Sequence, residues 1–175
     1  MSMPYNIANV RGPLEATVMK SPKTVVNILK HAKRPILIVE SNALKTVDDK
    51  SPIDFAIEFA KKTEMPVVAT AHTMKAFLER EFEAATVMGV ADITNRIIDP
   101  EWKGLDGKGG YDVIFYLGGL YYFQTQILSS IKHGATSLKS VSLDRSYDPN
   151  ATFSFGNLTV DEWSAALEEI LTLLK

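Results

Sequence analysis

The chain has 175 residues, of which 46% are hydrophobic and 23% charged, and a formal net charge of −2. This length suits one domain with a buried core, and the small negative charge argues against a nucleic-acid-binding protein, which would carry a basic excess. The absence of cysteine excludes disulfides, cysteine-held zinc, iron–sulfur clusters and a cysteine nucleophile on this chain. No apolar run approaches the ~20 residues that span a bilayer, and no signal-peptide pattern opens the chain. We therefore expect a cytoplasmic protein without a membrane partner.

Residues 1–20 predict an irregular N-terminal arm, because Pro4, Gly12 and Pro13 interrupt any period. The arm is nevertheless too apolar for a free disordered tail, so we expect it to lie on the domain or on a partner. Residues 21–175 then form a single α/β domain.

Two helix starts are marked by a serine before a proline, at Ser21-Pro22 and Ser51-Pro52. Asp54 completes a capping box at the second start. The first helix is expected to end near Ala32, and apolar strands at residues 36–39 and 65–69 follow the two helices. A further helix at residues 73–82, a short strand at 84–88 and a short helix at 92–98 come next.

The second half begins with a glycine-rich loop at residues 100–110. The most apolar strand (111–117) and a helix (121–132) follow. Residues 138–143 alternate polar and apolar side chains, which predicts an edge strand. A loop containing Phe153 and Phe155 leads to a last amphipathic helix, which opens with a capping box at residues 159–162.

Strands that alternate with helices predict a three-layer fold with a parallel sheet and right-handed crossovers. Ligands of such sheets bind at the carboxyl ends of the strands, where the strand order reverses. The candidate nucleotide crevice therefore consists of the residues that follow the strands: Glu40, Ser41, Asn42, Thr70, His72, Gly118, Gly119, Asp144 and Arg145.

Gly118-Gly119 is the strongest single signal, because two glycines between a strand and a helix let the backbone approach an anion such as pyrophosphate. A tight strand–helix turn is the alternative, since the full G-x-G-x-x-G fingerprint is absent. Glu40 would repel a diphosphate unless it holds a ribose hydroxyl.

The other candidate site residues also have two interpretations each. His72 could donate to a phosphate or simply bond within its loop. Asp144-Arg145 could recognise a nucleotide or form a surface ion pair. Three widely spaced histidines do not favour a metal site, and part of the aromatic run at residues 121–123 could face a partner.

Residues 34–39, 59–70 and 112–118 resemble the central domain of thiamine-diphosphate enzymes. This resemblance implies a DHS-like NAD/FAD-binding fold, shared with sirtuins and transhydrogenase nucleotide domains, and FAD as a candidate cofactor. The thiamine-binding domains and their metal motif are absent, so the chain is not such an enzyme.

A resemblance over nearly the whole chain is carried by residues 34–39, 64–70, 111–119, 143–151 and 155–158. These segments are similar to the epsilon subunit family of the archaeal carbon monoxide dehydrogenase/acetyl-CoA decarbonylase-synthase complex. The resemblance implies a non-catalytic accessory subunit, bound to a large (alpha) Ni-Fe-S CO dehydrogenase subunit in an assembly of two large and two small chains. Its implied role is to stabilise the large subunit or to assist electron transfer to FAD. The alternative is a stand-alone FAD- or NAD-binding protein or enzyme.

Overall fold

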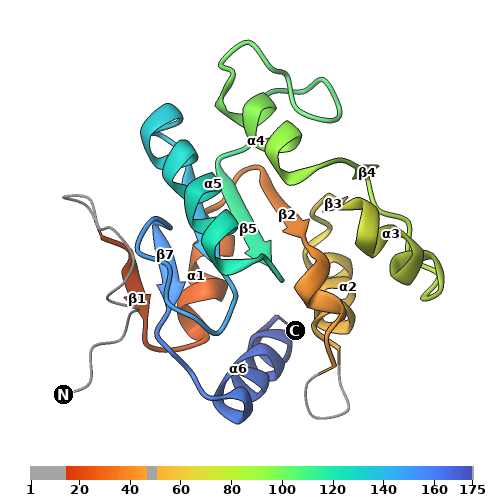
Figure 1. The fold of residues 1–175 in the computed structure, drawn as a ribbon, viewed down its shortest axis with the longest axis vertical. Helices are drawn as coiled ribbons and strands as arrows, with labels where there is room; N and C mark the ends of the chain where they lie inside the picture. The colour runs from red at the N-terminus through yellow and green to blue at the C-terminus, as the bar shows by residue number, and fades with distance from the viewer. Residues whose placement is uncertain (1–14, 47–50, 175) are drawn as a thin grey trace.

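The computed structural model describes residues 15–46 and 51–174. In these ranges the chain forms one seven-stranded, all-parallel sheet with the strand order β1-β7-β6-β5-β2-β3-β4, flanked by helices (Figure 1). The predicted α/β class with a parallel sheet is confirmed. No helix in these ranges is long and apolar enough to cross a membrane.

The elements follow one another in a regular alternation. The strands are β1 (Thr17–Met19), β2 (Pro35–Val39), β3 (Val67–Ala69), β4 (Thr86–Val87), β5 (Val113–Leu117), β6 (Lys139–Ser142) and β7 (Phe153–Phe155). The helices are α1 (Lys23–His31), α2 (Pro52–Thr63), α3 (Ala71–Leu78), α4 (Val90–Ile98), α5 (Tyr121–Gly134) and α6 (Val160–Leu173), with the 3-10 helix η1 (Ser41–Leu44) after β2. The predicted capping boxes of α2 and α6 are both present.

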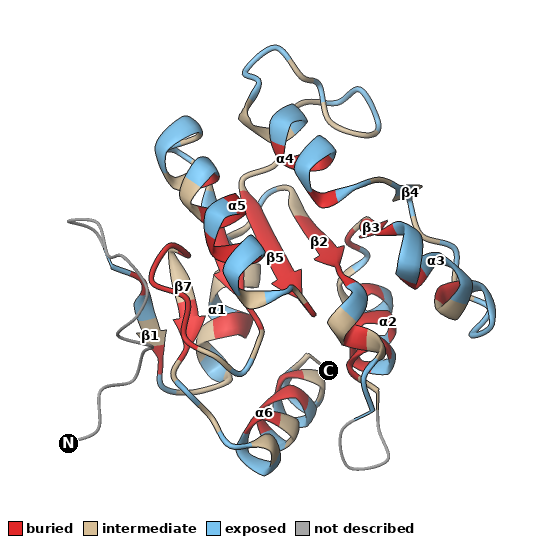
Figure 2. Cartoon of the chain, in the orientation of Figure 1, coloured by how far each residue is buried: buried red, intermediate tan, exposed pale blue. Residues whose placement is uncertain are grey.

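Two hydrophobic cores lie on opposite faces of the sheet. Alternate residues of each central strand point to opposite faces, so that Leu37 packs in the core formed with α1, α2, α3 and α6, and Ile38 in the core formed with α4 and α5. The central strands β2 and β5 are covered on both faces (Figure 2). Burial on both faces explains their continuous apolar sequences.

Two expectations about the end of the sheet were wrong. Residues 138–143 are not an edge, because β6 pairs with both β5 and β7. The alternation that suggested an edge comes from Ser140 and Ser142, which are buried. The Ser140 hydroxyl accepts the Thr152 amide, and the Ser142 hydroxyl accepts the Gln124 side chain, so these small polar side chains are satisfied inside the fold.

The predicted loop around Phe153 and Phe155 is strand β7, and Thr17–Met19 of the predicted irregular arm form β1 beside it. Each strand has only three residues, and neither is a continuous apolar run like that of the equally short β3. Pairing with a neighbour, rather than local pattern, gives them their extended form. Residues 1–14 of the predicted arm lie outside the described residues.

Candidate functional site

The strand order reverses between β2 and β5. From β2 the chain continues to β3 and β4 on one side, and then returns to β5 on the other side of β2. The loops that follow Val39 and Leu117 therefore meet at the carboxyl edge of the sheet, where a doubly wound fold binds its ligands.

At this switch point the segments that follow β2 and β5 are hydrogen-bonded to each other. The Glu40 amide donates to the Leu117 carbonyl (2.9 Å), and the Asn42 amide donates to the Gly118 carbonyl (2.8 Å). The side-chain amide of Asn42 donates to the Gly119 carbonyl at 2.8 Å. These bonds tie η1 to the loop after β5 and close the crevice between the two strands.

Position 118 requires glycine, because η1 and the loop after β5 approach each other closely here. Its φ is +79°, which L side chains rarely adopt, and a Cβ there would lie 2.3 Å from the Ala43 nitrogen and 2.7 Å from the Glu40 carbonyl oxygen. The glycine thus admits the backbone of η1 to the position where a classical fold admits a ligand.

Asp144 accepts two backbone amides of the loop between β5 and α5. Its two carboxylate oxygens accept the amides of Gly118 (2.8 Å) and Gly119 (3.3 Å). Asp144 is half-buried, with its carboxylate against these two amides. Burial raises the pKa of Asp144 to about 6, against the effect of the two amides. These two amides lie in the turn before α5, which begins at Tyr121. A carboxylate of the same chain therefore already holds the two glycine amides that the sequence offered for an anion.

Glu40 brings a second carboxyl group to the same edge. The residue is only 7% exposed, and its Oε1 has no hydrogen-bond partner among the described residues. Burial, and then the charge of Asp144, raise the pKa of Glu40 to about 7. Two buried carboxyl groups near one another disfavour a bound diphosphate.

The remaining predicted residues lie at the same edge with simpler surroundings. Thr70 is buried after β3, and its hydroxyl has no partner within the described ranges. Ser41 and His72 are exposed in the first turns of η1 and α3. The guanidinium of Arg145 is exposed and donates to the Leu158 carbonyl at 3.4 Å.

A cavity of about 330 Å³ opens beside the switch point, over the ends of β5 and β6. Of the predicted residues it brings together Asn42, Gly118, Gly119, Asp144 and Arg145, but not Glu40, Ser41, Thr70 or His72. Its other walls are Lys45, Pro52, Leu120, Tyr121, Gln124, Ser146 and Trp163.

Gln124 and Trp163 are among the wall residues that the sequence did not single out as site residues. Gln124 is buried, donates to the Ser142 hydroxyl at 3.2 Å, and leaves its Oε1 without a partner in the described structure. The Trp163 indole donates to the Leu143 carbonyl at 2.7 Å. A polar residue at an inward position of an amphipathic helix was the available signal for Gln124, whereas Trp163 looked like an ordinary member of the α6 apolar stripe.

No group of three or more His, Cys, Asp or Glu side chains that could hold a metal occurs within residues 15–46 and 51–174. What the site offers is a cavity beside two carboxyl groups, in which the amides of Gly118 and Gly119 are already bonded to Asp144.

Fold and site together define a doubly wound α/β protein whose switch point is closed by its own chain. A model of the family described as CO dehydrogenase beta subunit/acetyl-CoA synthase epsilon subunit matches residues 1–171. The chain belongs to this family, and the resemblance seen in the sequence is confirmed.

Three relatives that are named as epsilon subunits align with nearly the whole chain. The acetyl-CoA decarbonylase/synthase complex subunit epsilon of Methanothrix soehngenii is 38% identical, over 99% of this chain and 91% of its own length. Subunit epsilon 1 of Archaeoglobus fulgidus is also 38% identical, over 95% of this chain and 89% of its own. The subunit epsilon of Methanothermobacter thermautotrophicus is 32% identical, over 96% of this chain and 94% of its own. The family match therefore covers almost all of the residues that the structure describes.

Proposed function

We propose that the chain is a non-catalytic accessory subunit of the CO dehydrogenase component of an acetyl-CoA decarbonylase/synthase complex, in which it stabilises the large Ni-Fe-S subunit. The observation that carries the proposal is the family match over residues 1–171. The proposed assembly has two large and two small chains in the cytoplasm, with catalysis on the large subunit.

Exposed apolar side chains at the start of α5 support the proposal that the domain binds a partner. Leu120, Tyr122 and Phe123 are 61%, 64% and 40% exposed around the first turn of α5. Exposed apolar side chains that gather on one element mark interaction sites more often than scattered ones do. This part of the aromatic run is therefore available to another chain.

Binding of FAD is the alternative function, because the parallel sheet suits a DHS-like NAD/FAD-binding fold. The described residues do not fit a diphosphate at Gly118 and Gly119, since both amides already donate to Asp144 and Glu40 adds a second carboxyl group. We therefore derive no electron-transfer step, and we place stabilisation ahead of both FAD-linked electron transfer and stand-alone FAD or NAD binding.

Co-expression with the large chain tests the leading proposal. We expect the two chains to co-purify, native mass measurement to give two large and two small chains, and the large chain alone to aggregate at a lower temperature. A large chain that is equally stable alone, or that does not co-purify, would refute it.

A titration of the isolated chain with FAD, followed by flavin fluorescence with ADP as competitor, separates the two proposals. We expect no saturable binding. Saturable binding that ADP competes away would favour the nucleotide-binding alternative.

A further inference from the structure

Two exposed cations line the cavity at the carboxyl edge of the sheet. They are Lys45, which follows η1, and Arg145, which follows β6. Neither forms an ion pair with a residue that the structure describes. The guanidinium of Arg145 donates to the Leu158 carbonyl at 3.4 Å, which uses one of its five N–H groups. A chain with a net charge of −2 thus places two unpaired cations at one cavity.

Asp144 is the one acidic residue among the described walls of this cavity. Its two carboxylate oxygens accept the amides of Gly118 and Gly119, and it forms no ion pair with Lys45 or Arg145. The charge of Asp144 is therefore used within the loop. A counter-ion for the two cations has to come from outside the described chain, and a carboxylate suits the guanidinium of Arg145 best.

An exposed apolar surface adjoins the cavity. Leu120, which is 61% exposed, and Tyr121 both line it. The Tyr121 hydroxyl donates to the Tyr147 carbonyl at 3.1 Å, and its ring meets the ring of Tyr122 edge to face. Tyr122 and Phe123 then continue the surface away from the cavity. A small anion in the cavity would leave these side chains in water, whereas a polypeptide segment would cover them.

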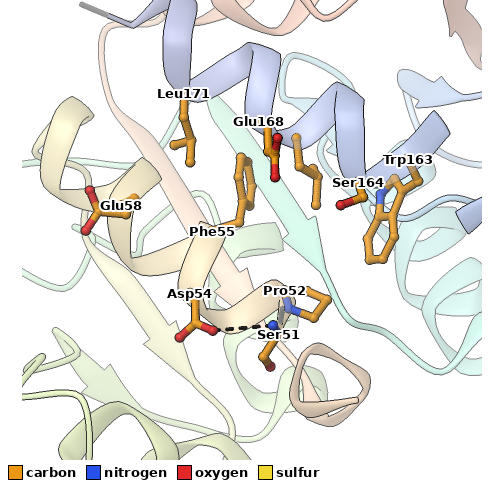
Figure 3. A pocket seen from close by; sticks show the side chains of 10 residues that line it. Ser51, Pro52, Asp54, Phe55, Glu58, Trp163, Ser164, Glu168 and Leu171 are labelled. Carbon is orange, nitrogen blue, oxygen red and sulfur yellow. Dashed lines mark hydrogen bonds between the residues drawn. The ribbon is translucent and has the colours of Figure 1, made fainter. Parts of the chain in front are cut away.

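A second pocket shares two walls with this cavity. Pro52 of α2 and Trp163 of α6 line both, and Figure 3 shows them at the second pocket. The described walls of that pocket include no Lys, Arg or His. The combination of unpaired cations with exposed apolar side chains therefore belongs to the first cavity.

We propose that this cavity docks an acidic side chain of the large CO dehydrogenase subunit. An Asp or Glu of that subunit lies between Lys45 and Arg145 and supplies their counter-ion. A large apolar side chain beside it packs on Leu120, Tyr122 and Phe123, so that the charge pair is shielded from water by an aromatic contact. This inference rests on the proposed function.

A second copy of this chain fits the same surface less well. A two-fold pair would bring the same patch of both copies together. Lys45 and Arg145 of one copy would then lie close to those of the other, at the cost of like-charge repulsion. Charge thus favours a partner of different sequence.

The first test reverses the charges and measures binding of the full chain to the large chain at two salt concentrations. The variant is Lys45→Glu with Arg145→Glu. Lys103→Glu with Lys108→Glu is the matched control, because both lysines are exposed and form no ion pair with a described residue. They lie in the loop before β5, at the opposite edge of the sheet.

We expect the reversal at the cavity to weaken binding roughly tenfold or more and to reduce its salt dependence. Tyr122→Ser should weaken binding as well, but with the salt dependence unchanged. Its control is Leu78→Ser, because Leu78 is similarly exposed on α3 and does not line the cavity. Both controls should bind within about twofold of the natural chain, and thermal unfolding should show that all variants are folded.

A cross-link identifies the occupant directly. The chain has no cysteine, so Leu120→Cys provides a single attachment point for a photoactivated cross-linker. We expect the linked peptide to come from the large chain and to contain an Asp or Glu beside a large apolar residue. Lys108→Cys, at the opposite edge of the sheet, should not give this peptide.

The outcomes separate this inference from the proposed function. Equal binding by the cavity reversal and its control would overturn the docking proposal while the natural chain still binds the large chain. Failure of the natural chain to bind would overturn both. A cross-link only to a second copy would overturn the choice of partner. Stabilisation of the isolated chain by citrate or inorganic pyrophosphate, abolished by the reversal without loss of large-chain binding, would overturn docking in favour of a small-anion site.

Discussion

The carboxylate of Asp144 accepts the backbone amide of Gly118 at 2.8 Å. This bond joins the loop after β6 to the loop after β5 and places a negative charge of the chain itself where the sequence suggested a bound phosphate. The neighbouring Gly119 amide donates to the other oxygen at 3.3 Å. The two glycine amides are thus held by an internal contact.

Asp144→Ala should destabilise the fold by about 1–3 kcal/mol, because two part-buried amides lose their acceptor. Urea unfolding measures this loss, and Asp144→Asn, which keeps one side-chain oxygen, should lose less. The alanine variant should also gain thermal stability from inorganic pyrophosphate, whereas the natural chain should not. Equal stabilisation of both proteins would contradict internal occupation of the amides.

Because of Glu40, the free energy of unfolding should fall as pH rises from about 4.5 to 7. Its pKa is raised to about 7 in the folded chain, from the ordinary value of 4.5. In this window the folded state holds a proton that the unfolded state releases, so unfolding is favoured as pH increases. The full effect is on the order of 3 kcal/mol at most.

The matched measurement compares the natural chain with Glu40→Gln by urea unfolding at pH 4.5 and pH 7.5. The glutamine variant should be relatively more stable at pH 7.5 and should lose part of the pH dependence. Asp144, whose pKa is raised to about 6, adds a smaller effect of the same sign. A natural chain and variant with parallel pH profiles would show that Glu40 does not carry this effect.

Gly118→Ala should cost more than the roughly 1 kcal/mol of a left-handed residue alone, because the new methyl group would also meet the backbone of Ala43 and Glu40. Gly110→Ala is the control, since nothing lies within 4 Å of a Cβ at Gly110. Denaturant midpoints should fall clearly for the first variant and change little for the second. Similar midpoints would mean that η1 moves aside readily.

Tyr147→Phe should loosen β1. The buried Tyr147 hydroxyl donates to the Ala16 carbonyl at 2.8 Å, and its loss leaves that carbonyl without this donor at a cost of about 1–3 kcal/mol. Hydrogen exchange should become faster at the amides of Thr17–Met19, while β5 stays protected. Unchanged exchange in β1 would show that the Tyr147 hydroxyl is not needed to hold this strand.

The sequence predicted the elements with strong local signals. The apolar runs of β2 and β5 and the capping boxes of α2 and α6 are confirmed, because burial on both faces and helix capping leave their patterns within a few residues. The short strands β1 and β7 were missed, because neither forms the continuous apolar run that marks the equally short β3.

Composition and residue order thus determined the α/β class, the parallel sheet and the family. Only the tertiary structure decided what Gly118-Gly119, Glu40 and Asp144 do. These residues are far apart in the chain, and either role suggested for the glycines was compatible with the sequence. The outcome depends on two distances, from Gly118 to Ala43 and from Gly118 to Asp144, which arise only when the loops after β2, β5 and β6 come together at one edge of the sheet.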